Sequence, residues 1–334
     1  MKRHAVALRI VGVCCVMLCL AAGRAAAAEP ARPSEQALTQ AVEGGVLAGT
    51  LMLPAASGKV PVALIIAGSG PTDRDGNSAL IAGHNDSLKM LATALAGQGI
   101  ASLRYDKRGI GASRTAMTSE SALRFDALVD DAARWVAALE ADPRFSRVVV
   151  IGHSEGSLIG MLAARATGAR PGADGFVSLA GIAERQSDVL RKQLAGKLAP
   201  EQARDNERIL SALEHGQSVP DVAPMWVRLY RPSVQPYLIS VYKYVPAHEI
   251  AALRMPVLIV QGTTDVQVGV DQAETLKVAR PDAALLIVPG MNHVLKAVPA
   301  DADPVASYGD PSLALHPQLA PAIVGFIRGL KPAD

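Results

Sequence analysis

The stretch Arg147-Val-Val-Val-Ile-Gly-His-Ser-Glu-Gly156 places a small, sharp turn directly after an apolar run. Its four consecutive β-branched residues are typical of a strand that is buried on both faces of a sheet. The G-x-S-x-G pattern that follows has glycine at 152 and 156, which lets the chain hold Ser154 in a strained, exposed conformation. Apolar side chains with helical spacing come next: Leu158, Ile159, Leu162 and Ala163. A strand, a tight turn and a helix in this order predict a nucleophilic serine at position 154.

Strand and helix patterns alternate on both sides of this stretch. Apolar runs predict further strands at 46–53, 60–67, 100–105, 175–180, 256–260 and 284–288. Apolar stripes with helical spacing predict helices at 88–95, 125–139 and 319–330. The polar, proline-containing residues 29–43 are expected to lead into the first strand, at 46–53. Such alternation predicts an α/β fold with a mostly parallel sheet flanked by helices.

Residues 182–253 interrupt the alternation, because they contain no pattern of a buried strand. Their first half is charged with helical character, and their second half is rich in proline and aromatic residues. Open α/β sheets bind ligands beyond the carboxyl ends of their strands, so we expect a helical cap insertion there, with 29–181 and 254–334 as the core. Trp226, Tyr230 and Tyr237 in the insertion are predicted to bind substrate. The alternative is that these aromatics only close the small core of a packing appendage.

A serine hydroxyl needs a base, and the base needs a carboxylate that orients it. In a fold of this kind the expected chain order is serine, acid and histidine. His293, in the loop directly after the last predicted strand, is the predicted base. Asp265, in the loop after the strand at 256–260, is the predicted acid, and Glu184, after the preceding strand, is the alternative. His153 is adjacent to the serine and is interpreted as a packing residue.

The negative charge that develops on the substrate oxygen needs hydrogen-bond donors that are fixed in advance. One predicted donor is the backbone N–H of Glu155, at the start of the helix after the nucleophile. The other is Ser69, in the loop Gly68-Ser-Gly-Pro71 after the strand at 60–67. A phosphate-binding loop is the weaker interpretation, because neither G-x-x-x-x-G-K-[ST] nor G-x-G-x-x-G is present. No H-E-x-x-H spacing is found either, so we expect no cofactor and no metal ion.

The chain has 334 residues, with 33 Lys and Arg against 31 Asp and Glu. Such balance argues against nucleic-acid binding, which normally needs a concentrated basic face. Lys2, Arg3 and His4 precede an apolar run over 5–22, and the alanines at 26–28 suit signal peptidase. We therefore expect a signal peptide at 1–28, export to the periplasm or the medium, and no membrane span in the mature chain; an uncleaved anchor is the alternative. All three cysteines lie in this segment, so no disulfide is expected after cleavage.

Five blocks of sequence stand out: Gly68-Ser-Gly-Pro-Thr-Asp-Arg-Asp-Gly-Asn77, Arg104-Tyr-Asp-Lys-Arg-Gly-Ile-Gly-Ala-Ser113, Gly152-His-Ser-Glu-Gly156, Gly262-Thr-Thr-Asp265 and Gly290-Met-Asn-His293. Together they resemble the α/β-hydrolase superfamily, in particular its bacterial secreted serine esterases related to dienelactone hydrolases and acyl-peptidases. The resemblance implies the α/β-hydrolase fold and the roles of nucleophile, acid and base for Ser154, Asp265 and His293. Many relatives begin the oxyanion loop with His-Gly, where this chain has Ala67 before Gly68.

The predicted residues and the resemblance together indicate an exported serine hydrolase that cleaves carboxylic esters through an acyl-enzyme. Its expected partner is a small-molecule ester, and the small cap favours short to medium acyl chains. A peptidase or a thioesterase would use the same triad and donors, so both stay open. A protein that binds ligand without turnover is an alternative from a different class. The natural substrate and the oligomeric state stay open as well.

Overall fold

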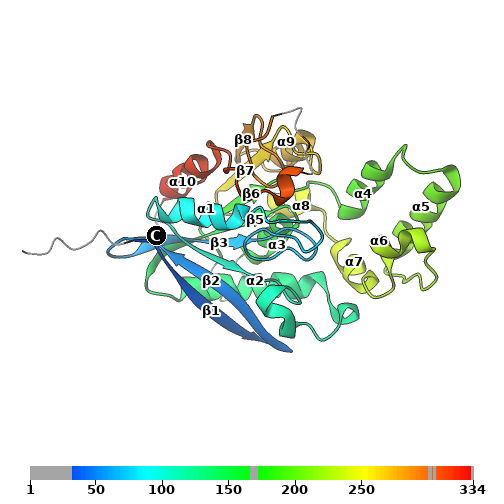
Figure 1. The fold of residues 1–334 in the computed structure, drawn as a ribbon, viewed down its shortest axis with the longest axis horizontal. Helices are drawn as coiled ribbons and strands as arrows, with labels where there is room; N and C mark the ends of the chain where they lie inside the picture. Colours follow the sequence, from blue (N-terminus) through cyan, green and yellow to red (C-terminus); the bar gives the residue numbers. More distant parts are fainter. Residues whose placement is uncertain (1–31, 166–171, 300–302, 304–305, 332–334) are drawn as a thin grey trace, which may run out of the picture. The chain divides into compact units, whose positions relative to one another are not determined.

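The computed structural model describes residues 32–165, 172–299, 303 and 306–331, so the predicted signal peptide lies outside the described residues. Within them, eight strands form one sheet in the order β1-β2-β4-β3-β5-β6-β7-β8 (Figure 1). Strands β3 to β8 run parallel to one another, whereas β2 pairs antiparallel with both β1 and β4. The predicted α/β fold is therefore confirmed. The strands are β1 (Ser34–Val42), β2 (Gly45–Leu53), β3 (Val60–Ile66), β4 (Ala101–Tyr105), β5 (Phe145–His153), β6 (Gly175–Leu179), β7 (Val257–Gly262) and β8 (Ala284–Val288).

The prediction that the first strand lies at 46–53 is wrong, because β1 precedes it. It forms an antiparallel hairpin with β2 over its whole length, with Val42 opposite Gly45. Most of its side chains are exposed, since it is the edge strand of the sheet. An edge strand needs no continuous apolar run, so the hydrophobic pattern does not reveal it. Backbone pairing with β2 stabilises it instead.

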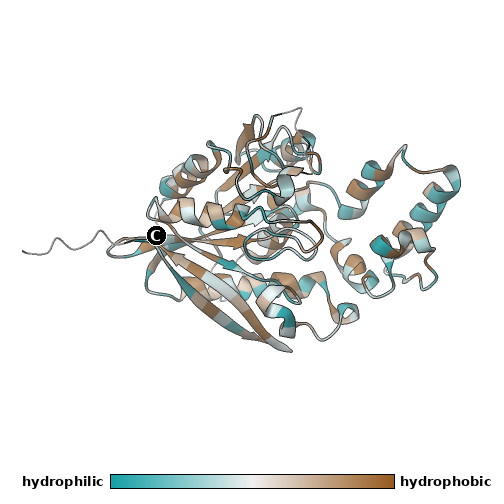
Figure 2. Cartoon of the chain, viewed as in Figure 1, coloured by the Kyte–Doolittle hydropathy of each residue, from teal (hydrophilic) through white to brown (hydrophobic). Residues whose placement is uncertain are grey.

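The sheet has a hydrophobic core on each face, and strand β5 shows how the sequence builds both. Val148 and Val150 belong to the core that contains helices α2 (Phe125–Glu140) and α3 (Glu155–Ala163). Val149 and Ile151 belong to the core that contains α1 (Ser87–Ala96) and α10 (Leu319–Gly329). Figure 2 shows the matching hydrophobic colour along the central strands. Because helices cover both faces, a strand in this position is apolar throughout.

The chain between β6 and β7 forms helices, in the place of the predicted insertion. They are α4 (Gln186–Leu194), α5 (Pro200–Glu214), the short η3 (Pro224–Trp226), α6 (Val227–Tyr230), α7 (Gln235–Val241) and α8 (Pro246–Ala251). Helix α7 is attached to α2, because the N–H of Phe125 donates to Oγ of Ser240 (2.7 Å). Helix α8 packs against α3 and α9 (Val270–Ala279), which flank the sheet (Figure 1). None of the helices in the described part of the chain has the length and hydropathy needed to cross a bilayer.

The loop after β4 is held by charged side chains that are largely buried. Asp106 accepts hydrogen bonds from the backbone N–H of Arg74 (2.8 Å), from its guanidinium (2.7 Å) and from the N–H of Ala112 (2.9 Å). Arg108 binds both carboxylate oxygens of Asp131 in α2, at 2.5 and 2.8 Å. A buried ion pair tolerates its desolvation only when its remaining donors and acceptors are also satisfied, as they are in both cases. The loop is therefore a rigid support next to the carboxyl end of the sheet.

Candidate active site

Ser154 lies at a strained turn between β5 and α3. Its backbone has φ 54° and ψ −122°, a conformation that costs an L-residue about 1–3 kcal/mol. The glycines of the motif permit this turn. A Cβ atom at position 152 would lie 2.2 Å from the carbonyl oxygen of Gly156, and one at 156 would lie 2.3 Å from that of Ile66. The turn presents a half-buried Ser154 to a cavity at the N-terminal end of α3.

The predicted base and the predicted acid are in direct contact. Nδ1 of His293 lies 2.8 Å from Oδ2 of Asp265; because a carboxylate only accepts, Nδ1 carries the proton and Nε2 is the acceptor. Asp265 also accepts from the N–H groups of Gln267 (2.8 Å) and Val268 (2.9 Å). Burial raises the pKa of Asp265, but the hydrogen bond and charge of His293 outweigh it, so this pKa lies below its ordinary value. The carboxylate therefore stays ionised at neutral pH and holds the imidazole in one tautomer.

The alternative acid, Glu184, makes a different contact. Its Oε1 lies 2.5 Å from Nζ of Lys192, a side chain that is 62% exposed. The geometry therefore assigns Asp265, and not Glu184, as the partner of His293.

His153 connects the turn at Ser154 to the loop that carries His293. Its Nε2 donates to the carbonyl oxygen of His293 (2.7 Å), and the centroids of the two imidazole rings are 4.9 Å apart. Burial, assisted by the charge of His293, lowers the pKa of His153 to about 4. His153 is therefore neutral at pH 7. Its hydrogen bond holds the end of β5 against the loop that carries His293, and this contact is compatible with a packing residue.

We expect His153 to make the protein less stable as the pH falls from 6.5 to 4. In this window the unfolded chain binds a proton on His153 and the folded chain does not, so the free energy of unfolding decreases with decreasing pH. The full effect is on the order of 3 kcal/mol. His153→Gln keeps an N–H for the carbonyl of His293 but does not titrate, so its loss of stability over the window should be smaller. Urea denaturation at four pH values between 4 and 7 measures this, and equal slopes for both proteins would contradict it.

The two predicted oxyanion donors lie on either side of Ser154. The N–H of Glu155 belongs to the first turn of α3, where amides have no acceptor within the helix. Gly68 packs against the turn, since a Cβ atom there would lie 3.2 Å from Cβ of Ser154. Ser69, the next residue, is exposed and lines the same cavity as Ser154. Both backbone segments are therefore next to the serine.

Two cavities adjoin this site. The elbow cavity, of about 280 Å³, is lined by Ser69, Ser154, Glu155 and mainly apolar side chains of α4, α6 and α7. The loop cavity, of about 490 Å³, is lined by Lys107, Glu155 and further residues of the loop after β4 and of α6 and α7. Helices of the insertion therefore form walls of both cavities, and Glu155 lies between them.

Two of the three aromatic residues predicted to bind substrate line these cavities, and one does not. Tyr230 lines the elbow cavity, and its hydroxyl donates to Asn206 (2.6 Å). Tyr237 lines the loop cavity, and its hydroxyl donates to Oε1 of Glu155 (2.6 Å). Trp226 is 3% exposed and packs on Tyr230, with ring centroids 5.9 Å apart. Trp226 lines neither of these two cavities, so its predicted contact with substrate stays a prediction.

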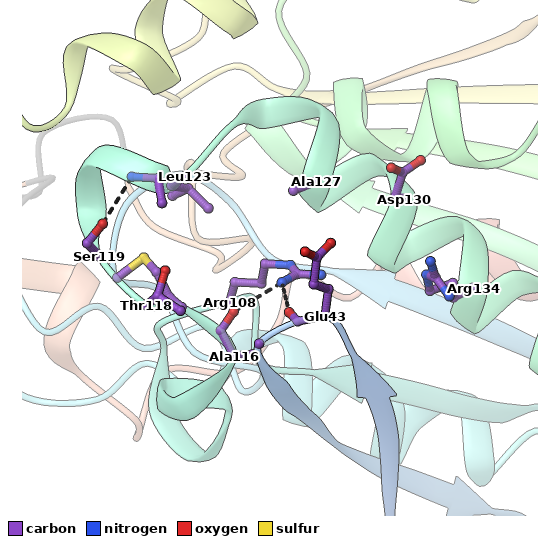
Figure 3. A pocket seen from close by; sticks show the side chains of 12 residues that line it. Glu43, Arg108, Ala116, Thr118, Ser119, Leu123, Ala127, Asp130 and Arg134 are labelled. Carbon is purple, nitrogen blue, oxygen red and sulfur yellow. Dashed lines mark hydrogen bonds between the residues drawn. The ribbon is translucent and has the colours of Figure 1, made fainter.

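A third cavity, of about 400 Å³, is lined by neither Ser154, Asp265 nor His293. Arg108 spans part of its wall and donates to the carbonyl oxygens of Glu43 (2.8 Å) and Ala116 (3.1 Å) (Figure 3). These hydrogen bonds from Arg108 connect the loop after β4 to the turn between β1 and β2. Among the described residues, no three His, Cys, Asp or Glu side chains have the arrangement of a metal site.

Two buried polar residues beside the site were missed by the motif analysis. Gln261, near the end of β7, donates to Oδ2 of Asp265 (3.1 Å) and to the carbonyl oxygen of Val268 (2.8 Å). A polar residue in an otherwise apolar strand is a signal that could have identified it. Lys107, which lies in one of the five sequence blocks, donates to the carbonyl oxygen of Gly68. Its partner is 39 residues away, so no local pattern could have identified the contact.

A family model described as serine aminopeptidase, S33 (Hydrolase_4), matches residues 81–297, which include the turn at Ser154, Asp265 and His293. The chain belongs to this family. A stretch of 264 residues of this S33 protein is 30% identical to esterase EstD of Thermotoga maritima, covering 78% of the chain and 60% of that relative. The S33 protein thus spans less than two thirds of the relative's length.

Solved structures agree with the α/β-hydrolase fold of the S33 protein. Est1E from Butyrivibrio proteoclasticus has a TM-score of 0.57 at 18% identity, with 87% of this chain and 97% of that chain covered. A putative hydrolase from Agrobacterium vitis S4 has a TM-score of 0.54 at 17% identity, with 90% and 99% covered. These structures confirm the predicted fold, and the family match and the relative EstD confirm the predicted superfamily. The narrower resemblance to dienelactone hydrolases and acyl-peptidases stays a prediction.

Proposed function

We propose that this S33 protein is a serine carboxylesterase in which Ser154, His293 and Asp265 form a catalytic triad. The observation that carries the proposal is the strained Ser154 at the N-terminus of α3, together with the buried His293–Asp265 pair. The name of the relative EstD agrees with an esterase. Because the match spans only part of that relative, the proposal rests on the site itself.

The site supplies each group that ester cleavage through an acyl-enzyme requires. Oγ of Ser154 attacks the ester carbonyl carbon as its proton passes to Nε2 of His293. The N–H groups of Ser69 and Glu155 stabilise the tetrahedral oxyanion. Collapse of this intermediate releases the alcohol, which takes the proton from Nε2. His293 then takes a proton from a water molecule as its oxygen attacks the acyl carbon. The bond to Oγ of Ser154 breaks, Oγ takes the proton back from Nε2, and the carboxylic acid leaves, while Asp265 orients the imidazole throughout.

The charges around the cavities favour an ester over the substrate of an aminopeptidase. A free α-ammonium group would need an unpaired carboxylate, and Glu155 is the sole acidic residue among those lining the elbow cavity. Its carboxylate accepts from Tyr237 (2.6 Å) and lies 3.8 Å from Nζ of Lys107. In the loop cavity, the other carboxylate is Glu120, which is bound by Arg231 and Ser233. An uncharged acyl group therefore suits the site better than an N-terminal amine.

The elbow cavity supports a preference for short to medium acyl chains. Its volume of about 280 Å³ is at the low end for ligand sites, and its apolar wall suits an alkyl group. Hydrolysis of p-nitrophenyl acetate, butyrate, octanoate and palmitate by residues 29–334 tests this, with alanine p-nitroanilide as the aminopeptidase probe. We expect kcat/KM to be highest for the acetate, butyrate or octanoate. A maximum at palmitate would contradict the chain-length limit, and cleavage of the anilide without any ester would contradict the esterase.

We also propose that the protein is exported, with its signal peptide removed before Glu29. The support is the charged start, the apolar run and the alanines at 26–28. The intact mass of the protein recovered from periplasm and medium checks this. A mass that includes residues 1–28, in a membrane fraction, would indicate an uncleaved anchor.

A further inference from the structure

Lys107 is a buried cation at the centre of the candidate site. Its side chain is 4% exposed, and its Nζ donates to the carbonyl oxygen of Gly68. The nearest carboxylate oxygen, Oε2 of Glu155, is 3.8 Å from Nζ, which is longer than a hydrogen bond. Burial lowers the pKa of Lys107, and the charge of Glu155 opposes this. The direct partner of the ammonium group is therefore a backbone carbonyl.

That carbonyl belongs to the same peptide unit as a predicted oxyanion donor. In a planar trans peptide, the C=O of Gly68 and the N–H of Ser69 point in opposite directions. A hydrogen bond that fixes the oxygen therefore also fixes the direction of the N–H. Gly68 lies against the turn at Ser154, because a side chain on Gly68 would begin only 3.2 Å from Cβ of that serine. The direction of this one peptide unit thus decides whether its N–H can serve the reaction.

Lys107 also contacts the residue that provides the second donor. The carboxylate of Glu155 lies between Nζ of Lys107 and the hydroxyl of Tyr237, while the backbone N–H of Glu155 begins α3. The ammonium group therefore contacts the peptide unit that carries the N–H of Ser69 and the side chain of the residue that carries the second N–H. It connects the loop after β3, the loop after β4 and the start of α3.

We propose that Lys107 is a positioning residue for the oxyanion hole, acting through the carbonyl of Gly68 to orient the N–H of Ser69. The inference rests on the proposed esterase function and assigns one residue's part in it. An ammonium group suits this position because it is a compact donor on a long stem that reaches the carbonyl from the next loop. Lys107 should therefore affect kcat and not KM, because the oxyanion that the N–H of Ser69 binds develops only in the transition state.

The test compares Lys107→Met, which removes the donor, with Lys107→Arg, which keeps one. Lys277→Met is the matched control, because Nζ of Lys277 in α9 also donates to backbone carbonyls, those of Pro281 (2.7 Å) and Ala283 (2.6 Å). We measure kcat and KM on p-nitrophenyl butyrate, inhibition by butylboronic acid, the unfolding temperature, and hydrogen–deuterium exchange of residues 66–72. If Lys107→Met does not fold, the smaller Lys107→Leu, which also lacks a donor, replaces it with the same expectations.

We expect Lys107→Met to lower kcat by about 10- to 100-fold with KM changed less than about twofold, below the roughly 10²–10³ lost when a donor is removed outright. The inhibition constant for the boronic acid, whose tetrahedral adduct also needs the donors, should rise by a similar factor. Exchange at 66–72 should become faster. Lys107→Arg should recover most of kcat, and Lys277→Met should match the unmodified protein in all but unfolding temperature.

The inference is overturned if Lys107→Met keeps kcat within about threefold of the unmodified protein, or changes KM alone. It is also overturned if a folded Lys107→Arg is as slow as Lys107→Met. Hydrogen–deuterium exchange at 66–72 distinguishes failure of the positioning role of Lys107 from failure of the proposed esterase function. If the unmodified protein cleaves no ester, the proposed function and the oxyanion role of Lys107 are both wrong. Faster exchange in Lys107→Met would then show only that Lys107 orders the loop at 66–72. If ester is cleaved and neither kcat nor exchange responds, Lys107 has no positioning role and the esterase stands.

Discussion

Ser154→Ala is expected to lower kcat/KM for p-nitrophenyl butyrate by about 10⁴-fold or more, since no other group can form the acyl-enzyme. The fold should persist, because the side chain is small and only half-buried. The strained backbone at φ 54° is set by the packing of the two glycines and not by the hydroxyl. Initial rates over a wide range of enzyme concentration, with the unfolding temperature measured in parallel, check both expectations.

Ser157→Ala is the matched control for this experiment. Ser157 lies one turn along α3, is buried, and its hydroxyl bonds that of Ser178 (2.7 Å). Its replacement should cost about 1 kcal/mol of stability and leave kcat/KM within about threefold. If Ser154→Ala retained more than a few per cent of the activity, the covalent mechanism would be wrong.

Asp265→Asn should lower kcat on the order of 10⁴-fold, the second-largest effect that we expect. The amide N–H would donate to Nδ1 of His293, so that the proton moves to Nε2 and the imidazole cannot accept from Ser154. Asp265 has a pKa below its ordinary value, so it stays ionised and the loss should persist across pH 6 to 9. Measurement of kcat against pH tests this. If Asp265→Asn only shifted the pH dependence of kcat, activity would recover at the low or the high end of this pH range.

Glu184→Gln is the control, because Glu184 is the alternative acid. It pairs with the largely exposed Lys192, and an exposed ion pair contributes little to stability, so we expect nearly unchanged activity and stability. If Glu184→Gln abolished activity and Asp265→Asn did not, the acid would have been assigned wrongly.

The buried strands and the turn at Ser154 could be predicted because their signals are local. The run at 147–151 is apolar on both faces, and the glycines at 152 and 156 stand at the spacing that the turn requires. Strand β1 could not, because it is an edge strand whose stability comes from pairing with β2. For Trp226 both alternatives stay open, because a large aromatic ring in an insertion can line a site or fill its interior, and composition does not distinguish the two.

Residue order and spacing alone determine the class of fold, and they predict the nucleophile and a short set of candidates for the base and the acid. They do so because strand, turn and helix propensities act over a few neighbouring residues. Three features depend on contacts between loops far apart in the chain. They are the choice of Asp265 over Glu184, the hydrogen bond from His153 to His293, and the hydrogen bond from Lys107 to Gly68. Such contacts follow from the strand order, which brings the carboxyl ends of β3 to β8 together, and only the folded chain brings these groups within hydrogen-bond distance.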